Sequence, residues 1–318
     1  MSPLATPAAV ALAFLVGLCA GSFLNVVIHR LPRMLERGWR ENIAEYLDGE
    51  AALPDAARAF RDWSARSGTS APLRDADTRT PVYNLAVPRS ACPACGHRIR
   101  ALENVPLVSW LALRARCRGC GAAISARYPL VELAGGVLAA LAIYRFGVTL
   151  AGVAACGLLW ALVALTLIDF DHKLLPDDIT LPLMWSGVLL HVVLAAVGTV
   201  APFGVRVDLA DSVIGAMAGY LALWSVYWLF RLLRGKEGMG YGDFKLLAAL
   251  GAWLGWQLLV PVILLSSVVG AIIGILLIVV RGRDHNLPLA FGPYLAIAGG
   301  VALFFGPALV ALQQGLLR

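Results

Sequence analysis

Residues 246–280 read LLAALGAWLGWQLLVPVILLSSVVGAIIGILLIVV and contain no charged side chain. A helix needs about 20 apolar residues to cross the hydrocarbon core of a bilayer, so this run is long for one crossing and short for two. The sequence GWQ at 255–257 supplies a turn near the middle of the run. We therefore expect two short membrane helices here, at 244–257 and 259–280.

The composition of the whole chain is that of a membrane protein. Hydrophobic residues make up 59% of the 318 and charged residues only 14%, whereas soluble domains carry roughly 25% charged residues. No basic residue precedes the first apolar run, at 8–28, so we expect a retained span rather than a cleaved signal. Further spans are expected at 130–146, 149–168, 179–200, 212–233 and 290–312.

These spans predict an all-α polytopic membrane protein with about eight transmembrane helices. We divide it into a first transmembrane helix at 1–28, an insert at 29–129 and a membrane bundle at 130–318. The insert contains 16 Arg, no Lys and 10 acidic residues. Positive charge beside membrane spans is typical of the cytoplasmic side, so we place the insert there and expect membrane lipid, and no nucleic acid, as a partner. Residues 34–80 look helical and polar, which predicts surface helices followed by a linker.

Four cysteines in the insert have the spacing of a metal site. Cys92 and Cys95 form one Cys-x-x-Cys pair, and Cys117 and Cys120 form a second pair after 21 intervening residues. Two such turns can bring four thiolates to one ion. Two disulfides or four free thiols are the alternatives, but disulfides are disfavoured in the cytoplasm. We expect a small zinc-ribbon-like insert with a structural zinc, because four sulfurs leave no coordination position for catalysis or for the neighbouring His97.

Two loops expected on the cytoplasmic side each carry an aspartate at the end of an apolar segment. Asp169 ends the span at 149–168, and Asp243 follows the glycine-rich GMGYG at 238–242. Ionisable groups near the membrane core are costly and indicate a functional site. Two carboxyl groups brought close together share one proton, so that one can activate water while the other donates to a peptide carbonyl. This is the chemistry of an aspartic protease.

The glycines before Asp243 fit the same interpretation. Gly238, Gly240 and Gly242 have no side chains, so an extended substrate peptide can lie against their backbone.

The residues alone leave other interpretations open. Asp243 can be a helix cap, and Asp171 and Asp177 can be solvated loop charges. A pair of intramembrane acids also suits a proton-coupled transporter.

Taken together, the motifs resemble those of bacterial prepilin peptidases, the type IV leader peptidase family. Four stretches follow the family's order: GSFLNVVIHRLP at 21–32, the cysteine region at 88–132, IDFDHKLLPD at 168–177 and GMGYGDFKLLAALGAW at 238–253. Residues 34–80 have no specific match in this comparison.

The resemblance implies an aspartic endopeptidase of the G-x-G-D type in the bacterial inner (cytoplasmic) membrane. Members cut the short basic leader from type IV prepilins and from the pseudopilins of type II secretion, just after a glycine. Many also methylate the new N-terminal residue from S-adenosylmethionine, and the cysteine-bearing insert is associated with those methylating members. The resemblance assigns catalysis to Asp169 and Asp243 and metal binding to the four cysteines. A peptidase without methylation, a proton-coupled transporter and a zinc-binding scaffold without chemistry are the alternatives.

Overall fold

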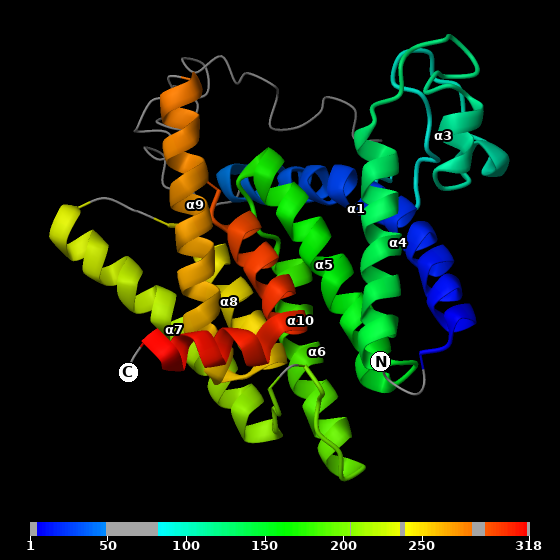
Figure 1. The fold of residues 1–318 in the computed structure, drawn as a ribbon. Helices are drawn as coiled ribbons and strands as arrows, with labels where there is room; N and C mark the ends of the chain where they lie inside the picture. Colours follow the sequence, from blue (N-terminus) through cyan, green and yellow to red (C-terminus); the bar gives the residue numbers. More distant parts are fainter. Residues whose placement is uncertain (1–4, 49–81, 204, 236–238, 282–289, 317–318) are drawn as a thin grey trace.

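The computed structural model describes residues 5–48, 82–203, 205–235, 239–281 and 290–316 (Figure 1). Within these ranges all regular secondary structure is helical, and extended pairing is limited to three isolated bridges. The elements in chain order are α1 (Pro7–Asp48), η1 (Ala101–Asn104), α3 (Val108–Ala112), α4 (Arg127–Phe146), α5 (Leu150–His172), α6 (Asp177–Ala196), α7 (Leu209–Arg234), α8 (Tyr241–Leu254), η2 (Trp256–Leu258), α9 (Leu259–Arg281) and α10 (Gly292–Leu316).

Seven helices in the described ranges are long and apolar enough to cross a membrane: α1, α4, α5, α6, α7, α9 and α10. The remaining expected span, at 244–257, is α8, whose 14 residues extend only about 21 Å, against a hydrocarbon core of about 30 Å. Gly255 ends α8 with a φ of 78°, as the expected turn at 255–257 requires. The all-α, multi-pass architecture is confirmed, and the eighth helix is a short one inside the bundle.

Helix α1 is longer than the expected first span. Its 42 residues extend about 63 Å, twice the thickness of the hydrocarbon core. Pro32 lies within the helix, and in Figure 1 the second half of α1 runs across the ends of α4 and α5 instead of continuing in the direction of the first half. The polar residues from 34 onward therefore continue α1 as far as Asp48, and the part of the expected surface helices at 49–80 lies outside the described residues.

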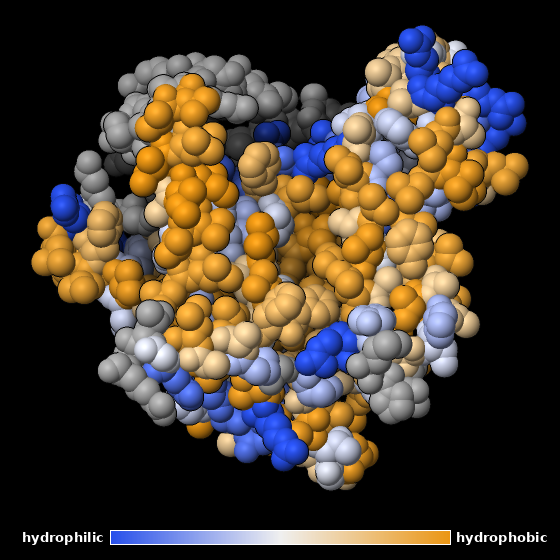
Figure 2. Space-filling model, in the orientation of Figure 1, coloured by the Kyte–Doolittle hydropathy of each residue, from blue (hydrophilic) through white to orange (hydrophobic). Residues whose placement is uncertain are grey.

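Helix α8 forms the centre of the bundle. Every residue from Leu246 to Leu254 is buried, and α6, α7 and α10 pack around it. Gly215 of α7 and Gly251 of α8 meet backbone to backbone, where a Cβ on either one would collide with the other's carbonyl. Small residues allow this close approach in membrane helix pairs. The face of the bundle shown in Figure 2 is largely apolar, as contact with lipid requires.

The segment between α6 and α7 closes one end of the bundle. Ala201 pairs with Val207 in an isolated bridge, and both residues and Phe203 are fully buried. The Phe203 ring packs against Trp253 of α8 at 6.0 Å between ring centroids. Gly255, just after α8, lies against the Val207 side chain. The segment therefore covers the C-terminal end of α8.

Candidate active site and cysteine cluster

Asp169 lies in the last turn of α5. The helix ends because Lys173 adopts a left-handed conformation with a φ of 56°, and its N–H donates to the carbonyl of Asp169 at 3.0 Å. Pro176 then takes the N-cap position of α6, where proline's missing N–H costs no helical hydrogen bond. Asp169 is only 5% exposed, and its Oδ2 atom has no hydrogen-bond partner.

Asp243 lies in the first turn of α8. The N-cap position belongs to Gly240, whose carbonyl accepts the N–H of Asp243 at 3.3 Å. Asp243 is 7% exposed, and its Oδ1 atom has no hydrogen-bond partner. Its side chain is therefore a buried group of its own and not the cap of the helix.

The two aspartates meet although they are far apart in the sequence. The Leu175 side chain, in the loop after α5, lies beside Gly242, the residue before Asp243, and also beside Gly292, which is next to Asp169 Oδ2. The two aspartates therefore lie around one leucine at neighbouring helix ends. Buried polar atoms almost always have a hydrogen-bond partner. Two neighbouring carboxyl groups that each keep an unpartnered oxygen can bind a water molecule or a polar group of a substrate.

The three glycines expected to border a substrate have different surroundings. Gly238 lies outside the described residues. Among the described residues, a Cβ on Gly240 would have only Asp243 Oδ2 near it, at 3.9 Å, so no described side chain fills the space beside this residue. A Cβ on Gly242 would lie 2.7 Å from Leu175 Cβ, so this leucine occupies the space beside Gly242.

Two ion pairs flank the aspartates and were not predicted. Asp171, two residues beyond the aspartate of α5, accepts from Nη1 and Nη2 of Arg127 at 3.0 and 2.6 Å. Lys245, two residues beyond the aspartate of α8, donates to both oxygens of Asp177 at 2.7 Å. The partners belong to the neighbouring helices α4 and α6, so Asp171 and Asp177 are tied to the bundle and are not free loop charges.

A third segment, the start of α10, also reaches the site. Gly292 is buried there beside Asp169 and Leu175. None of the sequence motifs described above includes Gly292. A single glycine at the start of an apolar run does not indicate which residues lie next to it in the folded protein.

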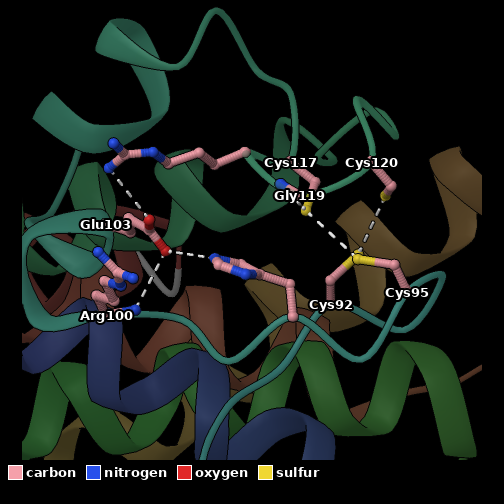
Figure 3. A network of polar contacts seen from close by, with 9 residues as sticks. Cys92, Cys95, Arg100, Glu103, Cys117, Gly119 and Cys120 are labelled. Carbon is pink, nitrogen blue, oxygen red and sulfur yellow. Dashed lines mark hydrogen bonds and ion pairs between the residues drawn. The ribbon is translucent and has the colours of Figure 1, made fainter.

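The four cysteines of the insert form one cluster (Figure 3). Their Sγ atoms all lie within 4.8 Å of one another. The separation is 3.9 Å between Cys92 and Cys120 and 4.0 Å between Cys95 and Cys117, and all four are free thiols. Four sulfurs at about 2.3 Å from a tetrahedral zinc ion would be about 3.8 Å apart. The cluster therefore has the dimensions of a four-sulfur zinc site.

The two cysteine turns are built alike. Gly96 and Gly121 have φ values of 70° and 72°, which glycine adopts without steric cost. Their N–H groups donate to the carbonyls of Cys92 and Cys117 at 2.9 and 2.8 Å. The repeated turn is what brings the two cysteines of each pair to the same side.

A charged network lies beside the cluster. Glu103 accepts the N–H of Arg100 at 3.2 Å, lies 3.0 Å from Nε2 of His97, and pairs with Arg118 at 3.5 Å (Figure 3). The N–H of Arg100, followed by the His97 ring, lowers the pKa of Glu103 below the usual carboxyl value. His97 therefore contacts a carboxylate and not the sulfur cluster, as its exclusion from the ligand set predicts.

Buried charged residues of α1 and α4 attach the insert to the membrane helices. Arg30 of α1 donates to the carbonyls of Asn84 at 2.9 Å and Pro88 at 2.6 Å. Glu132 of α4 accepts the N–H of Leu107 at 2.8 Å. Backbone groups of the insert thus satisfy two side chains that would otherwise be costly to bury.

Comparison with known proteins assigns the chain to a family. The model of the bacterial peptidase A24 N-terminal domain matches residues 15–146, and that of the type IV leader peptidase family matches residues 156–275. A prepilin leader peptidase/N-methyltransferase from Aeromonas salmonicida is 54% identical over 298 residues, which cover 94% of this chain and 91% of the relative. The chain belongs to the type IV leader peptidase family.

Other leader peptidases in the family are similar over almost the whole chain. Relatives with the same name from Pseudomonas aeruginosa and Burkholderia pseudomallei are each 49% identical, over 92% and 96% of this chain and 89% and 88% of their own lengths. No solved structure matches the chain. Both aspartates lie in the range matched by the leader peptidase family, and all four cysteines lie in the N-terminal match. The family resemblance is confirmed, and these names do not favour a transporter or a scaffold.

Proposed function

We propose that the chain removes the leader peptide from prepilins and that Asp169 and Asp243 perform the cleavage. The observation that supports this most is that two buried carboxyl groups, from α5 and α8, each keep an unpartnered oxygen and lie around the same leucine, Leu175. An ionisable pair at such a position is costly to maintain, which favours a catalytic use. The relatives are named as leader peptidases, and the two aspartates supply the base and the acid that peptide hydrolysis needs.

The two carboxyl groups act as base and acid. The ionised member takes a proton from water, whose oxygen attacks the carbonyl carbon of the glycine at the end of the leader. The protonated member donates its proton to the carbonyl oxygen. The C–N bond then breaks, and the amine of the mature chain leaves with a proton returned by the pair. The open space beside Gly240 suits the backbone of the bound peptide.

We place this reaction at the cytoplasmic boundary of the bacterial inner membrane. The ion pair between Arg127 and Asp171 joins the start of α4, which follows the insert, to the end of α5, which carries Asp169. The insert and the aspartates therefore share one side of the membrane, and the arginine-rich insert favours the cytoplasm. A basic leader remains on that side while the apolar segment after it enters the bilayer, which brings the bond to the depth of the aspartates.

We further propose a structural zinc ion and a second activity. Cys92, Cys95, Cys117 and Cys120 would hold the zinc, which fixes the fold of the insert and has no open position for a reactant. The N-methyltransferase named for the relatives would transfer a methyl group from S-adenosylmethionine to the new N-terminus. Type II secretion pseudopilins are proposed as substrates beside the type IV prepilins.

The peptidase proposal is tested with the full-length protein in detergent, following prepilin cleavage by mass spectrometry. We expect Asp169→Asn and Asp243→Asn each to slow leader removal at least about 100-fold, because an amide can neither activate water nor donate the required proton. Asp178→Asn is the matched control, since Asp178 is exposed on the first turn of α6, and it should cleave normally. Normal processing by either variant of the pair would refute the proposal.

Methylation needs a separate measurement on the same samples. The mature product should carry one methyl group on its N-terminal amine when S-adenosylmethionine is present. A cleaved but unmethylated product under those conditions would leave a peptidase without methyl transfer.

A further inference from the structure

Gly292, the first residue of α10, lies directly against Asp169. A Cβ placed on Gly292 would be 2.7 Å from Asp169 Oδ2, closer than a real Cβ approaches another heavy atom. Gly292 therefore contacts one of the two proposed catalytic groups, although it lies beyond the matched leader peptidase range of 156–275.

Leu175 connects Gly292 to the second aspartate. The Cδ1 atom of Leu175 would be 3.0 Å from a Cβ on Gly292, and its Cβ would be 2.7 Å from a Cβ on Gly242, the residue before Asp243. Leu175 is itself buried. One leucine from the loop after α5 thus fills the space that two glycines leave at the starts of α8 and α10.

Space, and not backbone conformation, explains the glycine at 292. Gly292 does not have the positive φ that makes glycine necessary at Gly255 and Gly235. Glycine is also a poor helix former, so a helix start gains nothing from it. What a side chain at 292 would meet is the carboxylate of Asp169 and the side chain of Leu175.

We propose that Gly292 is a positioning residue for Asp169. Its missing side chain lets the Asp169 carboxylate rest against the backbone of α10, and this contact sets the direction in which the carboxylate faces Asp243 and the scissile bond. The inference rests on the proposed peptidase function. It adds α10 to α5 and α8, the two helices that carry the catalytic pair.

The test is Gly292→Ala in the full-length protein, with cleavage rates measured over a range of prepilin concentrations. The added methyl group displaces the carboxylate by the order of an ångström, and a displacement of that size can slow a reaction by about 100-fold. We expect kcat to fall by roughly that factor with KM little changed, because the surfaces that bind the pilin helix are not altered. The pH–rate profile should shift as well, because the moved carboxylate interacts differently with Asp243.

Two further glycines of α10 provide matched controls. A Cβ on Gly300 would have only Leu159 near it, at 3.8 Å, so Gly300→Ala should cleave at the normal rate. A Cβ on Gly299 would collide with the Leu250 side chain, and Leu250 is about two helical turns beyond Asp243 along α8. Gly299→Ala should therefore lower the melting temperature while leaving kcat and the pH profile close to those of the parent.

A double variant separates the two contacts of Gly292. Leu175→Ala removes the collision with the leucine but leaves the one with Asp169. We expect Gly292→Ala to lower kcat in the Leu175→Ala background by nearly the same factor as in the parent. This comparison also decides the matter if Gly292→Ala alone does not fold. Recovery of kcat in the double variant would show that packing on Leu175 is responsible, and would overturn the proposal.

These experiments distinguish a failure of the positioning role of Gly292 from a failure of the proposed peptidase function. If Asp169→Asn cleaves normally, the peptidase proposal fails together with this inference. If Asp169→Asn is inactive but Gly292→Ala retains the kcat and pH profile of Gly300→Ala, the aspartate is catalytic and the positioning role of Gly292 alone is wrong.

Discussion

Gly240 and Gly242 stand two residues apart in one glycine-rich stretch and have different roles. No described residue fills the space between Gly240 and the Asp243 carboxylate, whereas Leu175 Cβ lies where a side chain of Gly242 would be. A Cβ atom cannot swing aside as the end of a long side chain can. Gly242 is therefore needed for helix packing, whereas Gly240 serves substrate access under the present proposal.

This difference predicts opposite outcomes for the two alanine variants. Gly242→Ala should cost about 1–3 kcal/mol of stability, as overpacked sites do, and should reduce prepilin cleavage because the start of α8 moves. Gly240→Ala should fold normally and, if the peptide lies there, mainly raise KM. Thermal unfolding and cleavage kinetics of the two purified proteins measure both effects. Equal melting temperatures for the two variants would contradict the packing role of Gly242.

At the scale of helices, two ion pairs hold the ends that carry the aspartates. Arg127 joins α4 to α5 through Asp171, and Asp177 joins α6 to α8 through Lys245. Such partly exposed pairs contribute little to overall stability, typically 0–1 kcal/mol. Their effect should instead appear in the relative placement of helix ends, where small displacements change rates strongly.

Charge reversal tests the pair that holds α8. Asp177→Lys places two lysines opposite each other, and Lys245→Glu does the same with two acids, so each single variant should cleave prepilin several-fold more slowly. The double variant restores an opposite-charge pair and should recover most of the rate. The singles should also be less impaired at high salt, because the repulsion is screened. A double variant no faster than either single variant would show that the ion pair does not matter for placement.

The sequence predicted the helices better than it predicted their contacts. The break between α8 and α9 was predictable because a turn there needs a residue such as Gly255 with positive φ. The continuation of α1 past residue 28 was not, since the change from apolar to polar residues marks the membrane boundary and not the end of a helix. The convergence of Asp169 with Asp243 followed from placing both loops on one side. The contacts of Lys245 and Gly292 depend on tertiary packing, which leaves no periodic pattern in the chain.

At the scale of the whole molecule, the insert and the bundle are joined by buried side chains. Arg30 and Glu132 project from α1 and α4 and bind backbone groups of the insert, before the first cysteine pair and between the two pairs. The cluster itself lies outside the bundle, and none of the described insert residues at 82–126 is buried. A metal ion at the cysteines would therefore stabilise the insert locally while leaving the packing of α8 unchanged.

This arrangement predicts a local effect of metal loss. The purified protein should contain one zinc ion per chain, and Cys117→Ser or Cys92→Ser should lose it. Hydrogen exchange should then become faster at 91–124 and stay slow in α8, which is buried along its length. Cys156→Ser is a suitable control, because Cys156 lies in α5 away from the cluster. A metal-free protein with the same slow exchange at 91–124 would rule out a structural zinc.

The covered end of α8 has a consequence for the supply of water. Peptide hydrolysis consumes one water molecule per bond, and the buried segment around Phe203 and Val207 covers the end of α8 opposite Asp243. Under the present proposal, water reaches Asp169 and Asp243 from the side of the membrane on which the basic leader lies. The same compartment delivers both reactants, so its acidity, and not that across the bilayer, governs how the proton is distributed before each turnover.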